Sequence, residues 1–262
     1  MAEGLRLEGI SLAFGGLQVL QGVSFETPPR ELLALIGPNG AGKTSVLNCI
    51  CGIYRASSGR ILFGGEEIGR TRPHQIARLG IARTFQHGEL FAHLSVIENL
   101  LIARHARIAT QLLGEGLFLP RVRKAEAEHR RAVEEVLEFT DLERYRHRRV
   151  DELPFGLQKI VGFARALAMQ PSVLLLDEPS AGLSRDERED LARYILRIQH
   201  ELEIPMIWVE HDMQMVSDLA DRLYVLDHGE PIAEGPPAEV LANPQVVRAY
   251  LGSGSARAAP SP

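Results

Sequence analysis

Hydrophobic and polar residues alternate in two segments near the start of the chain. Leu5 to Phe14 and Leu17 to Phe25 follow this pattern on either side of Gly15-Gly16. Alternation over this length predicts two strands, and the paired glycines predict a tight turn between them. Ile61-Leu62-Phe63, followed by Gly64-Gly65, is typical of a further hairpin element. We therefore expect an antiparallel β subdomain at the N-terminus.

A different pattern begins with the continuous hydrophobic run Leu32-Leu33-Ala34-Leu35-Ile36. A short run of this kind, bounded by glycine, is typical of a strand that is buried on both faces. A glycine-rich turn follows, and then a helical pattern over Lys43 to Ile53. Further along, the patterns predict helix 158–169, strand 173–176, helix 186–200, strand 206–209, helix 213–221 and strand 222–226. This alternation predicts an α/β fold, with a mostly parallel sheet covered by helices on both faces.

Between these regions, hydrophobic residues recur at helical spacing from Ser95 to about Glu143. We expect a helical subdomain over about 95–160, inserted into the α/β fold. Residues 121–149 hold nine Lys/Arg and seven Asp/Glu, which predicts a mixed, solvated surface. A C-terminal extension over about 229–252 completes the domain 1–252, and the small, polar residues 253–262 predict a disordered tail.

Charge and cysteine content exclude several classes of protein. The 262 residues include 29 Lys/Arg against 34 Asp/Glu, a net charge of -5, so no general positive field would recruit nucleic acid. Cys49 and Cys51 are the only cysteines, which excludes a disulfide framework and favours a cytosolic setting. We expect both to be small, buried hydrophobic residues. The first residues of the sequence predict no secretory signal, and no uncharged hydrophobic run is long enough to predict a helix that spans a bilayer.

The glycine-rich turn after the first buried strand carries the strongest chemical signal. Gly37-Pro38-Asn39-Gly40-Ala41-Gly42-Lys43-Thr44 follows the pattern G-x-x-x-x-G-K-[ST], between a predicted strand and a predicted helix. The glycines let backbone N–H groups turn toward phosphate oxygens, and the helix adds the positive end of its dipole. Lys43 brings a charge to the β- and γ-phosphates, and the Thr44 hydroxyl can ligate Mg²⁺. We predict a nucleotide site that extends from this turn to Ser45.

A second signal lies where the predicted strand 173–176 ends in two carboxylates, Asp177 and Glu178. Because burial of a charge is costly, a buried strand is expected to deliver carboxylates only where they have a role. In a phosphate-loop protein, Asp177 would hold Mg²⁺, commonly through water, and Glu178 would polarise the attacking water. Capping of the next helix is the alternative role that this pattern leaves open.

With these motifs in this order, the chain resembles the ATP-binding subunits of ABC transporters over nearly its whole length, to about Gly252. The resemblance implies an ATP hydrolase that uses Mg²⁺. It implies that Phe14 stacks on the adenine of ATP and that His211 contacts the γ-phosphate. The residues that it assigns to catalysis are Glu178, His211 and Gln86. The residues that it assigns to Mg²⁺, partly through water, are Thr44, Gln86 and Asp177.

The segment Leu153-Pro154-Phe155-Gly156-Leu157-Gln158 occupies the position of the family's signature, which contacts the ATP of a partner subunit. It departs from the general pattern Leu-Ser-Gly-Gly-Gln, because Pro154 replaces the serine, Phe155 a glycine and Leu157 the glutamine. The backbone of Gly156 and the helix that follows can still present donors to phosphate, with one side-chain donor fewer. The loop 180–184 also carries Ser184 in place of the usual aspartate. These departures lie on the surfaces through which two ATP sites communicate.

The Pro-aromatic-Gly signature is similar to that of one branch, the importers of branched-chain amino acids and their relatives. Phe14-Gly15-Gly16-Leu17, Arg83-Thr84-Phe85-Gln86-His87 and the segment 229–252 are also similar to this branch, and in particular to its longer ATP-binding subunit. This resemblance implies a peripheral protein on the cytoplasmic face of the inner membrane. The implied partners are transmembrane permease subunits, a second ATP-binding subunit, related or identical, and indirectly a solute-binding protein.

Three other functions stay open from the sequence. A soluble ABC-type ATPase without a permease is disfavoured by the single cassette and the modest insertion, and a lipid-extracting ATPase by the Pro-Phe-Gly signature. A small-molecule kinase would lack the combination of signature, Gln86 and His211. Among solutes, branched-chain amino acids compete with amides, urea and organic or aromatic acids.

Overall fold

The N-terminal strands form the expected antiparallel sheet. The structure, a computed structural model, describes residues 4–84, 90–104 and 120–255. Strand β1 (Leu5–Phe14) pairs with β2 (Leu17–Thr27) as an antiparallel hairpin. On its other edge β1 pairs with β4 (Ser58–Phe63), which continues into β5 (Glu66–Glu67). The two predicted hairpins therefore belong to one sheet, with the strand order β2-β1-β4-β5.

The central sheet has the order β10-β9-β3-β8-β7-β6, and only its edge strand β10 is antiparallel to its neighbour. Its strands are β3 (Leu32–Ile36), β6 (Ile81–Thr84), β7 (Val173–Asp177), β8 (Met206–Val209), β9 (Arg222–Asp227) and β10 (Glu230–Gly235). Every residue of β3, β7 and β8 is buried, as continuous hydrophobic runs predict for strands covered on both faces. The predicted mostly parallel sheet is confirmed.

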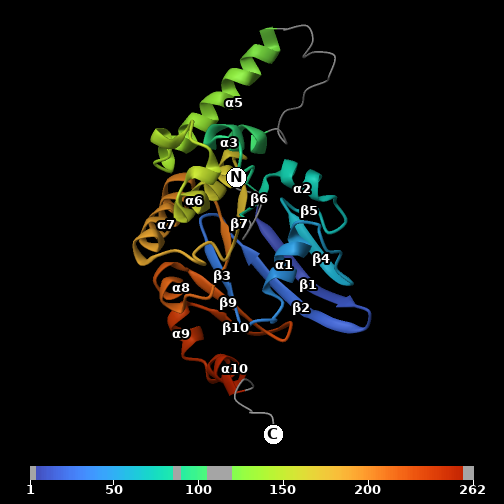
Figure 1. Cartoon of the computed structure of the whole chain (residues 1–262). Helices are drawn as coiled ribbons and strands as arrows, with labels where there is room; N and C mark the ends of the chain where they lie inside the picture. Colours follow the sequence, from blue (N-terminus) through green and yellow to red (C-terminus); the bar gives the residue numbers. More distant parts are fainter. Residues whose placement is uncertain (1–3, 85–89, 105–119, 256–262) are drawn as a thin grey trace.

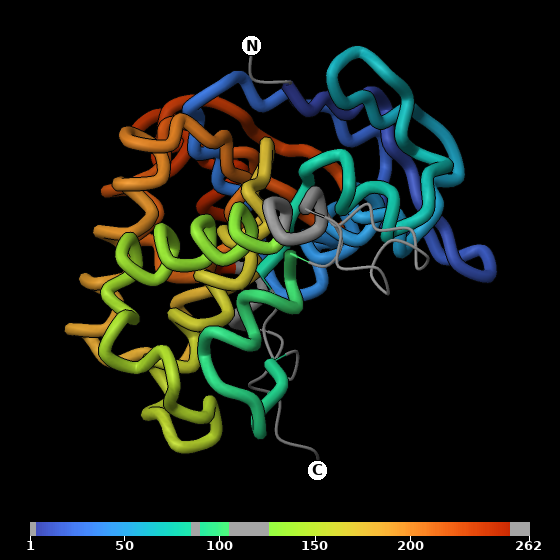
Figure 2. The backbone as a smooth tube through the Cα atoms, turned by 90° about the horizontal axis from the view of Figure 1, so that it is seen from above, coloured from blue at the N-terminus to red at the C-terminus, as the bar shows by residue number. Residues whose placement is uncertain are grey.

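Two hydrophobic cores lie on the two faces of the central sheet. Alternate residues of β3 divide between them, so that Ala34 belongs to one core and Leu35 to the other. One core packs α6 (Phe155–Ala168), α7 (Arg185–Arg197) and α8 (Met213–Leu219). The other packs α1 (Lys43–Ile50) together with the antiparallel sheet. Figures 1 and 2 show these layers on opposite sides of the molecule, with α6 in yellow and α7 and α8 in orange on one side, and the antiparallel sheet in blue to cyan on the other.

Helices dominate the described part of the predicted insertion. Helix α3 (Val96–Arg104) and α5 (Pro120–Phe139) pack against α6, and α5 projects from the body of the molecule (Figure 1). Leu100 and Leu137 join the core beneath them. Two short 3-10 turns, Glu143–Tyr145 and Val150–Glu152, lead from α5 to α6. The insertion is thus attached to the central sheet through α6.

Element boundaries differ from the predictions where caps and glycines act. Helix α1 ends at Ile50 instead of Ile53, because Gly52 adopts a left-handed conformation with φ 69°. Helix α6 begins three residues earlier than predicted, since Pro154 occupies its N-cap position. The predicted helix 186–200 is α7 followed by a wider π-helical turn over Ile198–Leu202.

Short and C-terminal elements were not predicted from the pattern. These are α2 (Pro73–Leu79), β6, β10, α9 (Pro237–Leu241) and α10 (Pro244–Ser255). Helix α10 runs into the segment for which the composition predicts disorder, and it is anchored by the buried Val246. Among the described residues, no helix is both long and apolar enough to cross a membrane.

The two cysteines lie at the end of α1, and neither forms a disulfide. Cys49 is buried, as expected, and burial raises the pKa of its thiol to about 11. Cys51 is half-buried. A thiol with a raised pKa is a poor nucleophile at neutral pH, so Cys49 acts as a small hydrophobic residue.

The double-sided burial of β3 predicts a large cost for truncation there. Leu35 is fully buried, so Leu35→Ala should lower the free energy of unfolding by about 2–5 kcal/mol through lost contacts and a new cavity. Leu251→Ala is the matched control, because Leu251 is 70% exposed and its truncation should cost less than about 0.5 kcal/mol. Denaturant unfolding measures both variants. Equal costs would contradict the burial of β3.

Candidate functional site

The glycine-rich loop connects β3 to α1, in the position expected for a phosphate-binding loop. Gly37, Gly40 and Gly42 all have positive φ, at 148°, 83° and 99°. A Cβ atom on Gly37 would lie 2.0 Å from the carbonyl oxygen of Leu226, and one on Gly42 would lie 2.7 Å from Leu20 Cδ2. Glycine is therefore required at Gly37 and Gly42 by both conformation and space. Backbone conformation and close packing therefore define the shape of the loop.

Lys43 begins α1 and folds back over this loop. Its Nζ donates hydrogen bonds to the carbonyl oxygens of Gly37, at 2.7 Å, and Pro38, at 2.9 Å. Burial lowers the pKa of Lys43, while the negative charges of Glu178 and Asp177 act in the opposite direction. A buried ammonium group thus lies at the loop and faces two carboxylates. The next two residues are more accessible, with Thr44 exposed and Ser45 half-buried.

The back of the loop is fastened to the C-terminal part of the chain. Gly229, in the turn between β9 and β10, donates its N–H to the carbonyl oxygen of Ala41 at 3.0 Å. Its own carbonyl oxygen accepts the N–H of Gln21 at 2.9 Å. The phenol of Tyr250, from α10, lies close to the backbone of Gly37, and burial raises the pKa of this phenol to about 12. The loop therefore depends on segments that are distant in the sequence.

Asp177 ends β7 as a buried carboxylate, only 4% exposed. Its Oδ2 forms an ion pair with Arg83, which comes from the neighbouring strand β6 and also donates to Asn48 Oδ1 of α1 at 2.6 Å. The other oxygen, Asp177 Oδ1, is buried and has no hydrogen-bond partner among the described residues. Because an unsatisfied buried acceptor is costly, this oxygen is suited to a water molecule or a cation.

The structure brings Glu178 and His211 together. Glu178 follows β7 and His211 follows the adjacent parallel strand β8. Glu178 Oε1 lies 2.8 Å from His211 Nε2, and both side chains are partly exposed. Glu178 has the left-handed φ of 46°, and its N–H donates to the carbonyl oxygen of Val209 at 2.9 Å. The two side chains, each predicted separately, thus meet at the edge of the sheet, and Glu178 is presented there by a strained turn.

The other expected ATP contacts differ in how the structure places them. Phe14 ends β1 with its ring 49% exposed, and the ring meets Tyr54 in an edge-to-face contact with 5.1 Å between centroids. An exposed ring of this kind is available for stacking. Gln86 lies outside the described residues. The preceding strand β6 ends at Thr84, beside the end of β7.

The signature segment forms the start of α6, so residues 155–158 lie in its first turn. The first N–H groups of a helix have no partner within the helix, which leaves donors for an anion. Pro154 is the N-cap residue, and Gln158 Nε2 donates to the carbonyl oxygen of the buried Leu153 at 2.9 Å. Gly156 and Leu157 complete this turn, where Gly156 is buried and Leu157 half-buried.

The signature segment also packs on the loop 180–184 and on α7. A Cβ atom on Gly156 would lie 1.9 Å from Glu187 Oε1, and one on Gly182 would lie 3.0 Å from the ring of Phe155. Ser184 forms a capping box with Glu187 at the start of α7. The residue that replaces the usual aspartate thus has a structural partner in its own chain.

The segment that leads to the signature is joined to the segment that follows Gln86. Residues 91–97 run alongside residues 146–151, with the N–H of Val96 donating to the carbonyl oxygen of Arg148 at 3.1 Å. The buried side chain of Asn99 forms hydrogen bonds with the backbone of Phe91 and Ser95, within residues 91–97. A displacement of residues 91–97 would therefore be passed to the segment that leads into α6.

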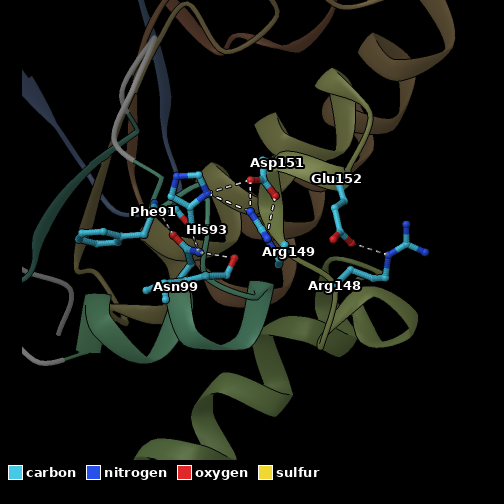
Figure 3. Close-up of polar contacts among 8 residues, drawn as sticks. Phe91, His93, Asn99, Arg148, Arg149, Asp151 and Glu152 are labelled. Atoms are coloured by element: carbon cyan, nitrogen blue, oxygen red, sulfur yellow. Dashed lines mark hydrogen bonds and ion pairs between the residues drawn. The ribbon is translucent and has the colours of Figure 1, made fainter.

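Figure 3 shows the polar contacts that join these two segments. Asn99 Oδ1 accepts the N–H of Phe91 at 2.8 Å, and Asn99 Nδ2 donates to the carbonyl oxygen of Phe91 at 3.1 Å. Above them, Asp151 Oδ2 contacts His93 Nδ1 at 3.0 Å and also pairs with Arg149. Arg149 lowers the pKa of Asp151, so this carboxylate stays charged at neutral pH. The ring of Phe91 is left exposed on the surface.

Four residues at the site received no role from the sequence: Arg83, Lys159, Glu210 and Gly229. Glu210 directly follows a buried strand, which is the same signal that singled out Asp177. Lys159 lies near Glu178, Glu210 and Asp177, whose charges oppose the lowering of its pKa by burial. The contacts of Arg83 and Gly229 join segments that are far apart in the sequence, so no local pattern indicates them.

Comparison with known proteins agrees with this geometry. Residues 20–181, more than half of the chain, match the ABC transporter family. The chain belongs to the ABC transporter ATPases. A second match, to the branched-chain amino acid ATP-binding cassette transporter family, covers residues 230–256 of the cassette. The resemblance inferred from the motifs is thus confirmed, and the cassette is an ATP hydrolase.

Curated relatives and solved structures cover nearly the whole cassette. It is 40% identical over 248 residues to the high-affinity branched-chain amino acid transport ATP-binding protein LivG of Escherichia coli K12, covering 95% of this chain and 97% of that one. It is 39% identical to BraF of Pseudomonas aeruginosa over 249 residues, with the same coverage. The crystal structure of a cassette from an ABC transporter in its ADP conformation matches with a TM-score of 0.83 and 33% identity, over 95% of this chain and 99% of that one.

The buried ammonium group at the loop predicts a strong effect of Lys43→Ala on nucleotide binding. The substitution deletes the positive charge expected to contact the β- and γ-phosphates, so ATP affinity should fall about tenfold or more. Titration with a fluorescent ATP analogue measures the affinity, and thermal unfolding confirms that the variant is folded. Affinity equal to that of the unmodified cassette would contradict the assignment of the phosphate loop.

Proposed function

We propose that this cassette is the ATP-hydrolysing subunit of an importer for branched-chain amino acids or related small solutes. The observation that carries the proposal is the combination of two features in one chain. The first is the ATP site formed by the phosphate loop, Asp177 and the Glu178–His211 pair. The second is the C-terminal region 230–256, which matches the branched-chain amino acid family and is fastened to that loop through Gly229.

In this proposal, ATP binds along the start of α1. Backbone N–H groups of residues 37–42 and the ammonium group of Lys43 hold the β- and γ-phosphates. Phe14 stacks on the adenine ring, and its exposed position at the end of β1 supports this role. Ser45 completes the phosphate contacts. Charge on the phosphates also explains why a lysine should be held in this place despite the cost of its burial.

Hydrolysis follows from the side chains at the ends of β7 and β8. Glu178 orients the attacking water and takes its proton, and His211 contacts the γ-phosphate. The contact of 2.8 Å between Glu178 Oε1 and His211 Nε2 supports a shared position beside the γ-phosphate. Lys43 and His211 stabilise the negative charge that develops on the phosphoryl oxygens. Gln86 would act with them on the attacking water.

The residues at the end of β7 fit Mg²⁺ bound together with ATP. The described residues hold no cluster of three or more His, Cys, Asp or Glu side chains that could bind a metal ion alone. The buried and unsatisfied Asp177 Oδ1 and the exposed Thr44 hydroxyl are suitable oxygen ligands, partly through water, and Gln86 would join them. When bound, Mg²⁺ neutralises charge on the β- and γ-phosphate oxygens.

A second ATP-binding subunit, identical or related, completes the site. Leu153–Gln158 would meet the ATP of that subunit, while the partner's signature would meet the ATP held here. ATP between the two surfaces would close the pair, and loss of the γ-phosphate would reopen it. A single copy should therefore hydrolyse ATP slowly. The first-turn N–H groups of α6 support the phosphate contact despite the altered signature.

Closure is transmitted to transmembrane permease subunits at the cytoplasmic face of the inner membrane. The surface proposed for this contact includes the exposed Phe91, in the segment hydrogen-bonded to residues 146–151. The solute crosses through the permease and is delivered to it by a solute-binding protein. The transported molecule therefore never needs to touch the cassette.

The proposed base predicts a selective loss of turnover. Glu178→Gln keeps the size of the side chain but removes its basicity, so ATP hydrolysis should fall by roughly 10²–10⁴-fold while ATP still binds. Phosphate release measures turnover, and a nucleotide titration measures binding. Glu230→Gln, at an exposed position in β10, is the matched control and should hydrolyse ATP normally. Unchanged turnover in Glu178→Gln would exclude the role of base.

The proposed partners predict which proteins purify with the cassette. A tagged full-length chain is isolated from gently solubilised membranes of its own cell, with the untagged chain as control, and the accompanying proteins are identified. We expect a hydrophobic permease pair and a second cassette protein. Recovery of soluble partners alone, with ATPase activity unaffected by membranes, would retain the ATP chemistry and overturn the transport function.

A further inference from the structure

Glu210 is a buried carboxylate to which the proposed hydrolysis gives no role. It lies between the end of β8 and His211, and it is 3% exposed. Its Oε1 accepts hydrogen bonds from the N–H groups of His211, at 2.7 Å, and Asp212, at 3.3 Å. Its Oε2 accepts the hydroxyl of Ser180 at 2.7 Å. Both oxygens are therefore occupied, one by the turn that carries His211 and the other by a different loop.

Ser180 begins the loop 180–184, which starts two residues after Glu178. The side chain of Ser180 is buried, and its hydroxyl leaves this loop to reach Glu210. At Gly182 the same loop lies against the ring of Phe155, at the start of the signature segment. A line of contacts thus runs from the signature surface to Glu210 and from there to His211.

Because Glu210 is buried, its hydrogen bonds to Ser180 and to the backbone of His211 are costly to break. A buried polar group is tolerated only when its hydrogen bonds are satisfied, so separation of Ser180 from Glu210 would leave the buried Oε2 without this partner. The N–H of His211 is held by the same carboxylate, which fixes the backbone from which the imidazole projects. Because His211 Nε2 lies 2.8 Å from Glu178 Oε1, a small shift of this backbone would change the geometry of the hydrolytic pair.

We propose that Glu210 is a positioning residue that couples the loop 180–184 to the Glu178–His211 pair. Hydrolysis in this cassette then depends on the placement of a loop that packs against its own signature segment. The inference rests on the roles proposed for Glu178 and His211. It does not depend on which solute is carried or on the identity of the permease.

Three variants separate a connecting role from a general structural one. Ser180→Ala and Glu210→Ala both remove the link, and each should lower kcat for ATP hydrolysis about tenfold, with the ATP dissociation constant unchanged. Glu210→Gln should keep kcat within about threefold of the unmodified value, because its amide can accept from His211 and donate to Ser180 Oγ. The full-length chain is assayed as it purifies, together with the subunits that accompany it.

The double variant Ser180→Ala/Glu210→Ala tests whether the two residues act through one contact. If they do, it should be no slower than the slower single variant. Multiplied losses, an equal loss in Glu210→Gln, or a fall in ATP affinity that matches the fall in kcat would each overturn the proposal. Should Glu210→Ala fail to fold, Ser180→Ala decides alone, because normal kcat in that variant would overturn it.

The Glu178→Gln variant distinguishes failure of this inference from failure of the proposed site. Normal hydrolysis in Glu178→Gln would remove the base to which the coupling is directed. Loss of hydrolysis in Glu178→Gln, with normal kcat in Ser180→Ala and Glu210→Ala, would leave the proposed chemistry in place and overturn only the role of Glu210.

Discussion

The proposed ATP site depends on the burial of a charge at the end of β7. Asp177 is shielded from water, and an unpaired carboxylate in such a place would cost several kcal/mol. Arg83, from the neighbouring strand β6, forms an ion pair with this carboxylate and also donates a hydrogen bond to Asn48 of α1. One arginine side chain thereby joins the strand that leads toward Gln86, the strand that ends in Asp177 and the helix that begins at Lys43. The remaining oxygen of Asp177 is buried and has no hydrogen-bond partner in the described part of the chain.

Parallel pairing of the central strands then gathers the chemistry at one edge. In the register of the sheet, Val209 lies opposite both Leu35 and Asp177, so β3, β7 and β8 end at the same level. The residues that follow these strands are the phosphate loop, Glu178 and the turn from Glu210 to His211. Open α/β sheets bind ligands at this edge because the ends of several strands meet there. The order of the parallel strands is therefore as important for the site as the sequence motifs, because it brings the ends of β3, β7 and β8 together.

Continuous hydrophobic runs explain why the central strands and the phosphate loop could be predicted from the sequence. β3, β7 and β8 are buried on both faces, so each can be predicted from its own local sequence, and the acidic residues at the end of β7 stand out against that run. The strand β6 lacks such a run because its second half is Arg83 and Thr84, and the early start of α6 is set by Pro154 as its cap. The links from Arg83 to Asp177 and from Ser180 to Glu210 join residues 94 and 30 positions apart, which no sequence window spans.

The turn at Gly229 limits which C-terminal regions from related cassettes could replace the one in this chain. A Cβ atom there would lie 2.2 Å from the carbonyl oxygen of Val19, and φ is 83°, so the position admits no side chain without rebuilding three segments. The C-terminal region begins at the next residue, which makes Gly229 the boundary at which a chimaera would be cut. Recombination that grafts a foreign C-terminal region can succeed only if this glycine and the hairpin around it are inherited together. The C-terminal region thus follows the rest of the cassette in the sequence, but in the fold it is hydrogen-bonded to the glycine-rich loop and to β2 through Gly229.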